Sequence, residues 1–157
     1  MKTNKSLLIL IALLALGLLG VALYLQHILG MQPCPLCVIQ RYAFAAIALS
    51  CLIAAALPPN GERIGSGLGA LVALAGAGVA AWHLHVKANP SVSCGIDPLE
   101  TSLNHFFTAD LLPFLFKADG LCSADYAPIL GLSIPQWSLL WFALFGVMLM
   151  RITFKRH

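Results

Sequence analysis

Four long apolar stretches, separated by shorter polar ones, dominate the pattern along this chain. They cover residues 7–29, 38–57, 64–86 and 135–152. Each is close to the roughly 20 apolar residues that a helix needs to cross a hydrocarbon core about 30 Å thick. The first stretch is longer than the core of a signal peptide and lacks its small-residue end, so we expect a permanent span. The pattern predicts an all-α membrane protein, a bundle of four transmembrane helices forming a single domain over residues 1–157.

The composition agrees with this prediction and excludes other classes. Hydrophobic residues make up 60% of the chain and charged residues only 10%, with a mean hydropathy of +0.89. Soluble domains carry about 25% charged residues. The net charge of +3 is small, and the basic residues form no stripe that could follow a nucleic acid.

A long polar interval, residues 87–134, separates the third and fourth apolar stretches. Within it, residues 98–116 carry leucines and phenylalanines among polar residues, with Pro113 as an interruption. This mixture predicts a short amphipathic helix that lies on the membrane surface. The alternative is a loop packed on the bundle.

The basic residues predict how the bundle is oriented. Four spans place both termini on one side of the membrane. Six of the nine lysines and arginines lie at the termini or in the loop after the second span: Lys2, Lys5, Arg63, Arg151, Lys155 and Arg156. The positive-inside rule makes that side the cytoplasm. The loops at residues 30–37 and 87–134 are therefore expected on the outer side, where disulfides persist.

A Cys-x-x-Cys pair, Cys34 and Cys37, stands where the second span begins. Pro35 suits the first helical turn, and the positive end of a helix favours a thiolate. This placement favours a redox role over a purely structural disulfide. A haem attachment site is excluded because Val38, not histidine, follows Cys37.

Three further cysteines complete the set. Cys94 and Cys122 lie in the long outer loop, whereas Cys51 lies inside the second span and is expected to be a small buried apolar residue. The wide pair could staple its loop, exchange electrons with the Cys-x-x-Cys pair, or join it in a four-thiolate zinc site. We favour exchange, although the four outer cysteines allow three disulfide pairings.

Arg41 and two histidines are candidate ligand-binding residues. Arg41 follows Cys37 by one helical turn, so its charge can stabilise a thiolate or polarise a carbonyl oxygen; alternatively it reaches to the membrane interface. His83 and His85 stand at the outer end of the third span, and either could donate a hydrogen bond to a ligand. We favour His83.

Taken together, these motifs resemble a known family. Gln26-His27, the pattern Pro33-Cys34-x-x-Cys37-x-x-x-Arg41, the wide pair Cys94 and Cys122, and residues 131–137 (Gly-Leu-Ser-Ile-Pro-Gln-Trp) are similar to the bacterial disulfide bond formation protein B (DsbB) family. The likeness covers about residues 6 to 150. It rests on the combination, since each motif alone is weak.

The resemblance implies an oxidoreductase of the bacterial inner membrane, with both termini cytoplasmic and its redox cysteines periplasmic. Such an enzyme reoxidises DsbA, a thioredoxin-like periplasmic dithiol oxidase, and passes the electrons to ubiquinone or menaquinone. This transfer of electrons to quinone keeps the bacterial periplasm oxidising. The rival interpretation is a structural or assembly membrane protein whose disulfides are not catalytic.

The resemblance also implies roles for individual residues. Reduced DsbA would attack a Cys94–Cys122 disulfide, and Cys34 would exchange with Cys122. Cys37 would be the thiolate beside the quinone ring. Arg41 would hold a quinone carbonyl, and His83 corresponds best to the family's quinone-side histidine, with His85 as the alternative.

Overall fold

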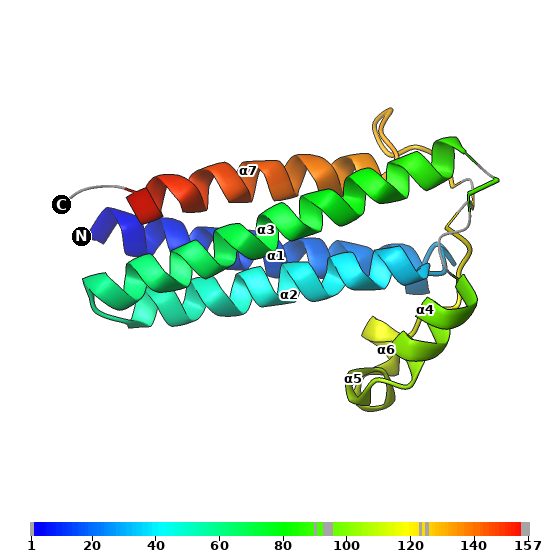
Figure 1. The fold of residues 1–157 in the computed structure, drawn as a ribbon, viewed down its shortest axis with the longest axis horizontal. Coiled ribbons are helices and arrows are strands. Elements are labelled where there is room, and N and C mark those ends of the chain that lie inside the picture. The colour runs from blue at the N-terminus through cyan, green and yellow to red at the C-terminus, as the bar shows by residue number, and fades with distance from the viewer. Residues whose placement is uncertain (1, 90, 93–95, 123, 125, 155–157) are drawn as a thin grey trace.

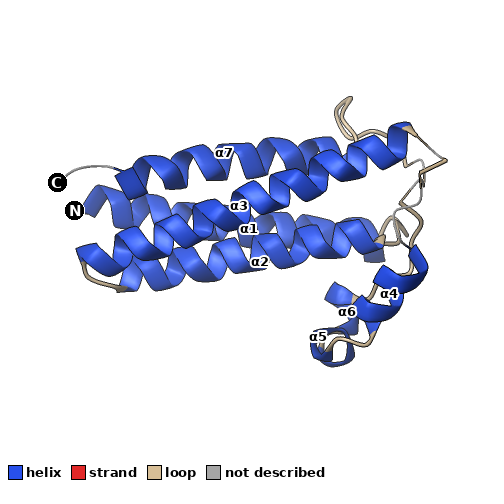
Figure 2. Ribbon diagram, viewed as in Figure 1, coloured by secondary structure: helices blue, strands red, loops and turns tan. Residues whose placement is uncertain are grey.

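The computed structural model describes residues 2–89, 91–92, 96–122, 124 and 126–154. These residues form seven helices: α1 (Lys2–His27), α2 (Pro35–Ala56), α3 (Pro59–Ala88), α4 (Ile96–Asn104), α5 (Phe107–Leu111), α6 (Pro113–Phe116) and α7 (Ile134–Phe154). Over the same residues there is no β-strand, only an isolated bridge between Ile129 and Leu132 (Figure 2).

The four long helices α1, α2, α3 and α7 lie side by side as an elongated bundle (Figure 1). Within the described residues, these four helices are long and apolar enough to cross a membrane, and each overlaps one of the predicted stretches. Many large apolar side chains on their outer faces are exposed, such as Leu13 at 60% and Leu71 at 64%. The prediction of an all-α protein with a four-helix membrane bundle is confirmed.

The order of packing leaves one side of the bundle less closed than the others. Helix α2 packs against α1 and α3, and α3 packs against α7, whereas α1 and α7 make few contacts. Both termini and the α2–α3 turn lie at one end of the bundle (Figure 1). The loop before α2 and the short helices α4, α5 and α6 lie at the other end, where the long loop meets the segment before α2 (Figure 1).

Stacked aromatic rings fill the centre of the bundle. The rings of Phe44 and Phe142 are stacked with centroids 4.2 Å apart, and Phe145 meets Phe44 edge-on at 6.4 Å. Phe142 and Phe145 are fully buried. Gly76 of α3 allows this close approach, because a Cβ atom at this position would lie only 2.6 Å from the Phe142 ring.

The segment predicted as one amphipathic helix, residues 98–116, instead contains α4, α5 and α6. Helix α5 ends at Leu111, and α6 begins at Pro113, whose ring nitrogen has no hydrogen to continue the preceding ladder. Tyr42 of α2 holds this segment to the bundle by stacking on Phe116 and by a hydrogen bond with the Thr108 hydroxyl.

The end of the long loop is tied to the residues that precede α2. The backbone N–H groups of Asp119 and Gly120 both donate to the Pro33 carbonyl, at 3.1 and 3.0 Å. Gly120 lies against the Gln32 backbone so closely that a Cβ atom there would be 2.8 Å from the Gln32 carbonyl carbon. These contacts fix the segment that leads to Cys122 beside the segment that leads to Cys34.

Candidate active site

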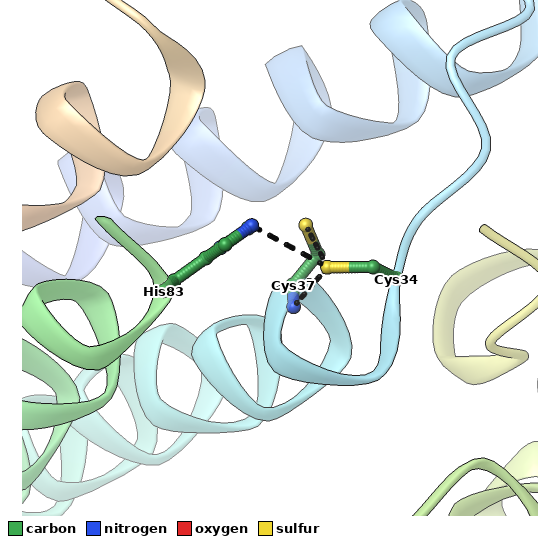
Figure 3. Close-up of side chains that lie close together, drawn as sticks. All are labelled: Cys34, Cys37 and His83. Carbon is green, nitrogen blue, oxygen red and sulfur yellow. Dashed lines mark hydrogen bonds between the residues drawn. The ribbon is translucent and has the colours of Figure 1, made fainter. Parts of the chain in front are cut away.

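The Cys-x-x-Cys pair forms the first turn of α2. Cys34 is the N-cap residue, and its Sγ accepts a hydrogen bond from the Cys37 N–H at 3.3 Å. Pro35 occupies the first turn, where its missing N–H leaves no bond unmade. The two Sγ atoms are 2.9 Å apart and unbonded, with Cys34 as donor (Figure 3). A disulfide requires about 2.05 Å, so a small rotation of the side chains suffices to close it.

Cys34 keeps its proton more firmly than an ordinary cysteine does. Its pKa is raised, first by the hydrogen bond to the Cys37 sulfur and then by burial, because only 2% of the residue is exposed. The Coulombic effect of Cys37 acts in the same direction. In the reduced pair, the proton therefore stays on Cys34 and the sulfur of Cys37 accepts the hydrogen bond.

His83 of α3 points toward this pair from the neighbouring helix (Figure 3). Its Nε2 lies 3.7 Å from the Cys34 Sγ and 3.3 Å from the Cys122 carbonyl oxygen. Its Nδ1 lies 3.3 Å from the Gln40 side-chain nitrogen. Because a carbonyl oxygen only accepts, these contacts favour a neutral ring with the proton on Nε2, and an amide N–H of Gln40 donating to Nδ1.

His85, the other candidate histidine, lies elsewhere. It is exposed, and its ring stacks on Trp82 with centroids 5.3 Å apart. Two residues along a helix correspond to about 200° of rotation, so His83 and His85 occupy opposite faces. The structure brings His83, and not His85, to the cysteine pair.

Arg41 is held inside the protein by oxygen atoms from two other segments. Its Nη1 donates to the Gln26 Oε1 and to the Leu115 carbonyl, both at 2.7 Å, and its Nη2 donates to the Ala22 carbonyl at 3.4 Å. Only 6% of the residue is exposed. The guanidinium thus links α1 and the end of α6 to α2, one turn from Cys37.

Cys122 and Cys94 are the two cysteines of the long loop between α3 and α7. Cys122 takes part in a disulfide, is 2% exposed and belongs to the same buried cluster as Cys34. Cys94 lies outside the described residues. Among the described cysteines, Cys34, Cys37 and Cys51 are free, and Cys51 is fully buried in the core of the bundle.

A cavity of about 300 Å³ opens beside the cysteine pair. Helices α1 and α7 supply its apolar walls, including Leu18, Trp137 and Trp141. Cys37, Arg41 and His83 line it as well, together with Cys34 and Cys122. An apolar cavity with a few converging polar groups is the usual form of a small-molecule site.

Comparison with known proteins agrees with this geometry. The family model described as "Disulfide bond formation protein DsbB" matches residues 4–152. The chain belongs to the DsbB family. It is 61% identical over 156 residues to the "Disulfide bond formation protein B" of Herminiimonas arsenicoxydans, a match that covers 99% of each chain. It is 46% identical over 154 residues to the protein of the same name from Ralstonia nicotianae, covering 98% and 96% of the two chains.

Membership of the DsbB family makes the chain a membrane oxidoreductase of disulfide bond formation. The chain is also 51% identical over 138 residues to the "Disulfide bond formation protein B" of Cupriavidus necator, a match that covers 88% of this chain and 85% of that protein. The fold and the cysteine pair at a helix start are those expected for such an enzyme.

Sequence reasoning missed one residue of this DsbB-family site and gave no role to another. Gln40 is 4% exposed and contacts His83, and Gln26 accepts a hydrogen bond from Arg41. Gln26 entered the prediction only as part of a family motif. A polar residue in an otherwise apolar span is the signal that could have identified Gln40, since a buried amide needs a partner.

Proposed function

We propose that this chain is an inner-membrane enzyme that reoxidises a DsbA-like periplasmic dithiol oxidase and passes the electrons to a membrane quinone. One observation carries the proposal. Cys34 and Cys37 line an apolar cavity and also adjoin the segment of Cys122, a cysteine already in a disulfide. A relay from a protein thiol to a lipid-soluble acceptor needs contact with a second cysteine on one side and with an apolar cavity on the other.

Disulfide exchange can carry the electrons along this route. In our scheme a thiolate of the partner attacks Cys94 of a Cys94–Cys122 disulfide, which releases the Cys122 thiolate. The partner's second thiol then completes its own disulfide, displacing Cys94. The Cys122 thiolate attacks the Cys34 sulfur of an oxidised Cys34–Cys37 pair and releases the Cys37 thiolate; Cys94 closes the loop disulfide again and frees Cys34. Two electrons and two protons thus move from the partner to the Cys34–Cys37 pair.

The residues around the cavity fit a quinone. A quinone, when bound, supplies a two-electron acceptor. Arg41 and His83 would hold its carbonyl oxygens, and Cys37 would lie at its ring. The apolar walls from α1 and α7 suit a ring with a hydrophobic tail, and the weak contact between these helices gives a route from the bilayer. Ubiquinone and menaquinone both satisfy these requirements.

Redox energies support the need for such an acceptor. An ordinary structural disulfide has a potential below about −300 mV, whereas that of DsbA is near −120 mV. The gap of roughly 180 mV corresponds to about 8 kcal/mol for two electrons. A disulfide without a strong acceptor beside it could not oxidise DsbA.

The proposal includes an orientation in the membrane. By the positive-inside rule, the end of the bundle with both termini and the α2–α3 turn faces the cytoplasm. The end with the cysteine pair then faces the periplasm. The large apolar side chains Phe106, Phe107 and Leu111 are 60%, 71% and 62% exposed, which suits contact with the membrane surface beside that end.

Quinone absorbance over time tests the proposed function. The assay combines purified chain, ubiquinone or menaquinone, and reduced DsbA, and compares Cys37→Ser and Cys94→Ser with Cys51→Ser as the matched control. We expect quinone reduction to stop in the Cys37→Ser and Cys94→Ser variants and to persist in the control. Quinone reduction that does not need Cys37 would exclude the relay, and stable, unreactive disulfides would favour the structural interpretation.

A further inference from the structure

We propose that reduced Cys34 and Cys37, together with His83, form a binding site for a thiophilic divalent cation of the Zn²⁺ type. The site lies within the redox centre but has a different ligand and a different consequence from quinone reduction. The three donor atoms, two Sγ and one imidazole nitrogen, all lie within 4.8 Å of one another (Figure 3). Such a site exists only while the two cysteines are reduced.

The donor geometry is close to that of a tetrahedral site. Zinc binds sulfur at about 2.3 Å and nitrogen at about 2.0–2.1 Å, so tetrahedral angles require roughly 3.8 Å between two sulfurs and roughly 3.6 Å between sulfur and nitrogen. The distance from Cys34 Sγ to His83 Nε2 is already 3.7 Å. The two sulfurs, 2.9 Å apart, need to separate by about 0.9 Å, a change that side-chain rotation can supply.

Gln40 can orient His83 for metal binding through a hydrogen bond to its other ring nitrogen. A ligating imidazole donates its other N–H to an oxygen, which fixes the tautomer and the ring orientation. The Gln40 amide is 3.3 Å from His83 Nδ1, and turning it end for end would present its oxygen to that N–H. His83 Nε2 would then be free to bind the cation and would give up its contact with the Cys122 carbonyl.

Charge and access also suit this cation. Both cysteines bind as thiolates, which requires loss of the proton on Cys34, so two thiolates neutralise a divalent cation and no electron is transferred. The guanidinium of Arg41 keeps its positive charge while it donates to oxygen atoms of Gln26, Leu115 and Ala22, but a divalent cation bound by two thiolates presents no net charge to it. Three protein ligands leave a fourth position for water, and the cavity provides the space.

This site differs from the four-cysteine zinc site considered from the sequence, because His83 replaces the wide pair and Cys122 is held in a disulfide. A bound cation would occupy both sulfurs and block their oxidation. The reduced enzyme would therefore be inhibited by the metal, whereas the oxidised enzyme would not bind it. The inhibition rests on the proposed function, but the binding does not.

Cobalt titration tests the binding without quinone or a protein partner. The full chain carrying Cys94→Ser and Cys122→Ser, which removes the other outer thiols, is purified in detergent, reduced and desalted under anaerobic conditions. Added Co²⁺ should produce the thiolate charge-transfer and visible bands of a tetrahedral site, and Zn²⁺ should abolish them. Oxidation of the Cys34–Cys37 pair should remove the bands.

Variants in the same background identify the ligands. Cys37→Ser and His83→Ala should lose the tetrahedral spectrum, whereas His85→Ala, the matched control, should keep it. Gln40→Leu should weaken binding about 10- to 100-fold, and Gln40→Glu, which retains an acceptor for Nδ1–H, should restore it. Circular dichroism checks that each variant is folded. Equal binding by the oxidised pair, or a spectrum unchanged by His83→Ala in folded protein, would overturn the proposal.

Discussion

Gly120→Ala should slow electron transfer between the long loop and the Cys-x-x-Cys pair. The added Cβ atom would overlap the Gln32 carbonyl oxygen and lie 2.8 Å from the carbonyl carbon, whereas ordinary contact begins at 3.4 Å, so the two backbones must separate by more than 0.6 Å. That movement strains the hydrogen bonds from Asp119 and Gly120 to the Pro33 carbonyl. At about 0.5–1.5 kcal/mol each, their loss costs roughly 1–3 kcal/mol. If the whole cost adds to the activation free energy of disulfide exchange, the rate of electron transfer drops about 5- to 150-fold.

Stopped-flow measurement of quinone absorbance, driven by reduced DsbA, gives this rate. Gly78→Ala is the control, because a Cβ atom at that position meets nothing within 4 Å. Thermal unfolding in detergent shows whether the Gly120→Ala bundle remains intact. A wild-type rate in a folded Gly120→Ala chain would refute the idea that these loop contacts align the two cysteine pairs.

Three further predictions concern the bundle, the arginine and pH. Gly76→Ala should lower the free energy of unfolding by about 1–3 kcal/mol, because its Cβ would meet the Phe142 ring of α7 at 2.6 Å. Gly146→Ala, whose nearest contact is 3.8 Å away, should change it little, and thermal unfolding in detergent compares the two variants. Gln26→Leu removes a charge-assisted hydrogen bond from Arg41, worth about 1.5–3 kcal/mol, and should raise the apparent quinone KM more than it lowers kcat with DsbA; an unchanged KM would contradict this. The hydrogen bond to Cys37 and then burial raise the pKa of Cys34, so the folded protein keeps a proton that the unfolded chain loses at high pH. Reduced protein should therefore lose stability as the pH rises above the ordinary cysteine pKa of about 8.5, by up to about 1.4 kcal/mol per pH unit, and unfolding of Cys34→Ser should lack this part of the pH dependence.

The four membrane helices could be predicted from the sequence because one physical requirement decides them. About 20 apolar residues are needed to cross the hydrocarbon core, and stretches of this length are visible without any knowledge of packing. The relation between Cys37 and Arg41 could be predicted for a similar reason, since positions four apart share a helix face. The three helices at residues 96–116 were harder, because Pro113 signals an interruption but nothing comparable marks the end of α4.

The rest of the candidate site depends on contacts between distant segments. The choice between His83 and His85 requires knowing which face of α3 meets α2, and an apolar helix rich in glycine and alanine gives no clear face. Gln40 and His83 are 43 positions apart, and Arg41 binds the backbone carbonyl of Leu115. A carbonyl oxygen is present at every residue, so no sequence pattern could identify this partner.

The burial of Cys34 gives a physical reason for the proposed relay through two cysteine pairs. Cys34 is 2% exposed and is enclosed by Leu36, Val86 and the Cys122 segment, so the sulfur of a folded protein partner cannot approach it directly. Exposing the pair would admit the partner but would also open the apolar cavity to water and to small thiols. In the proposed relay a second disulfide on a loop would resolve this conflict, because its own cysteine would reach Cys34 while the partner stays outside. The hydrogen bonds to the Pro33 carbonyl and the contact between His83 and the Cys122 carbonyl would hold that loop in place for the proposed exchange.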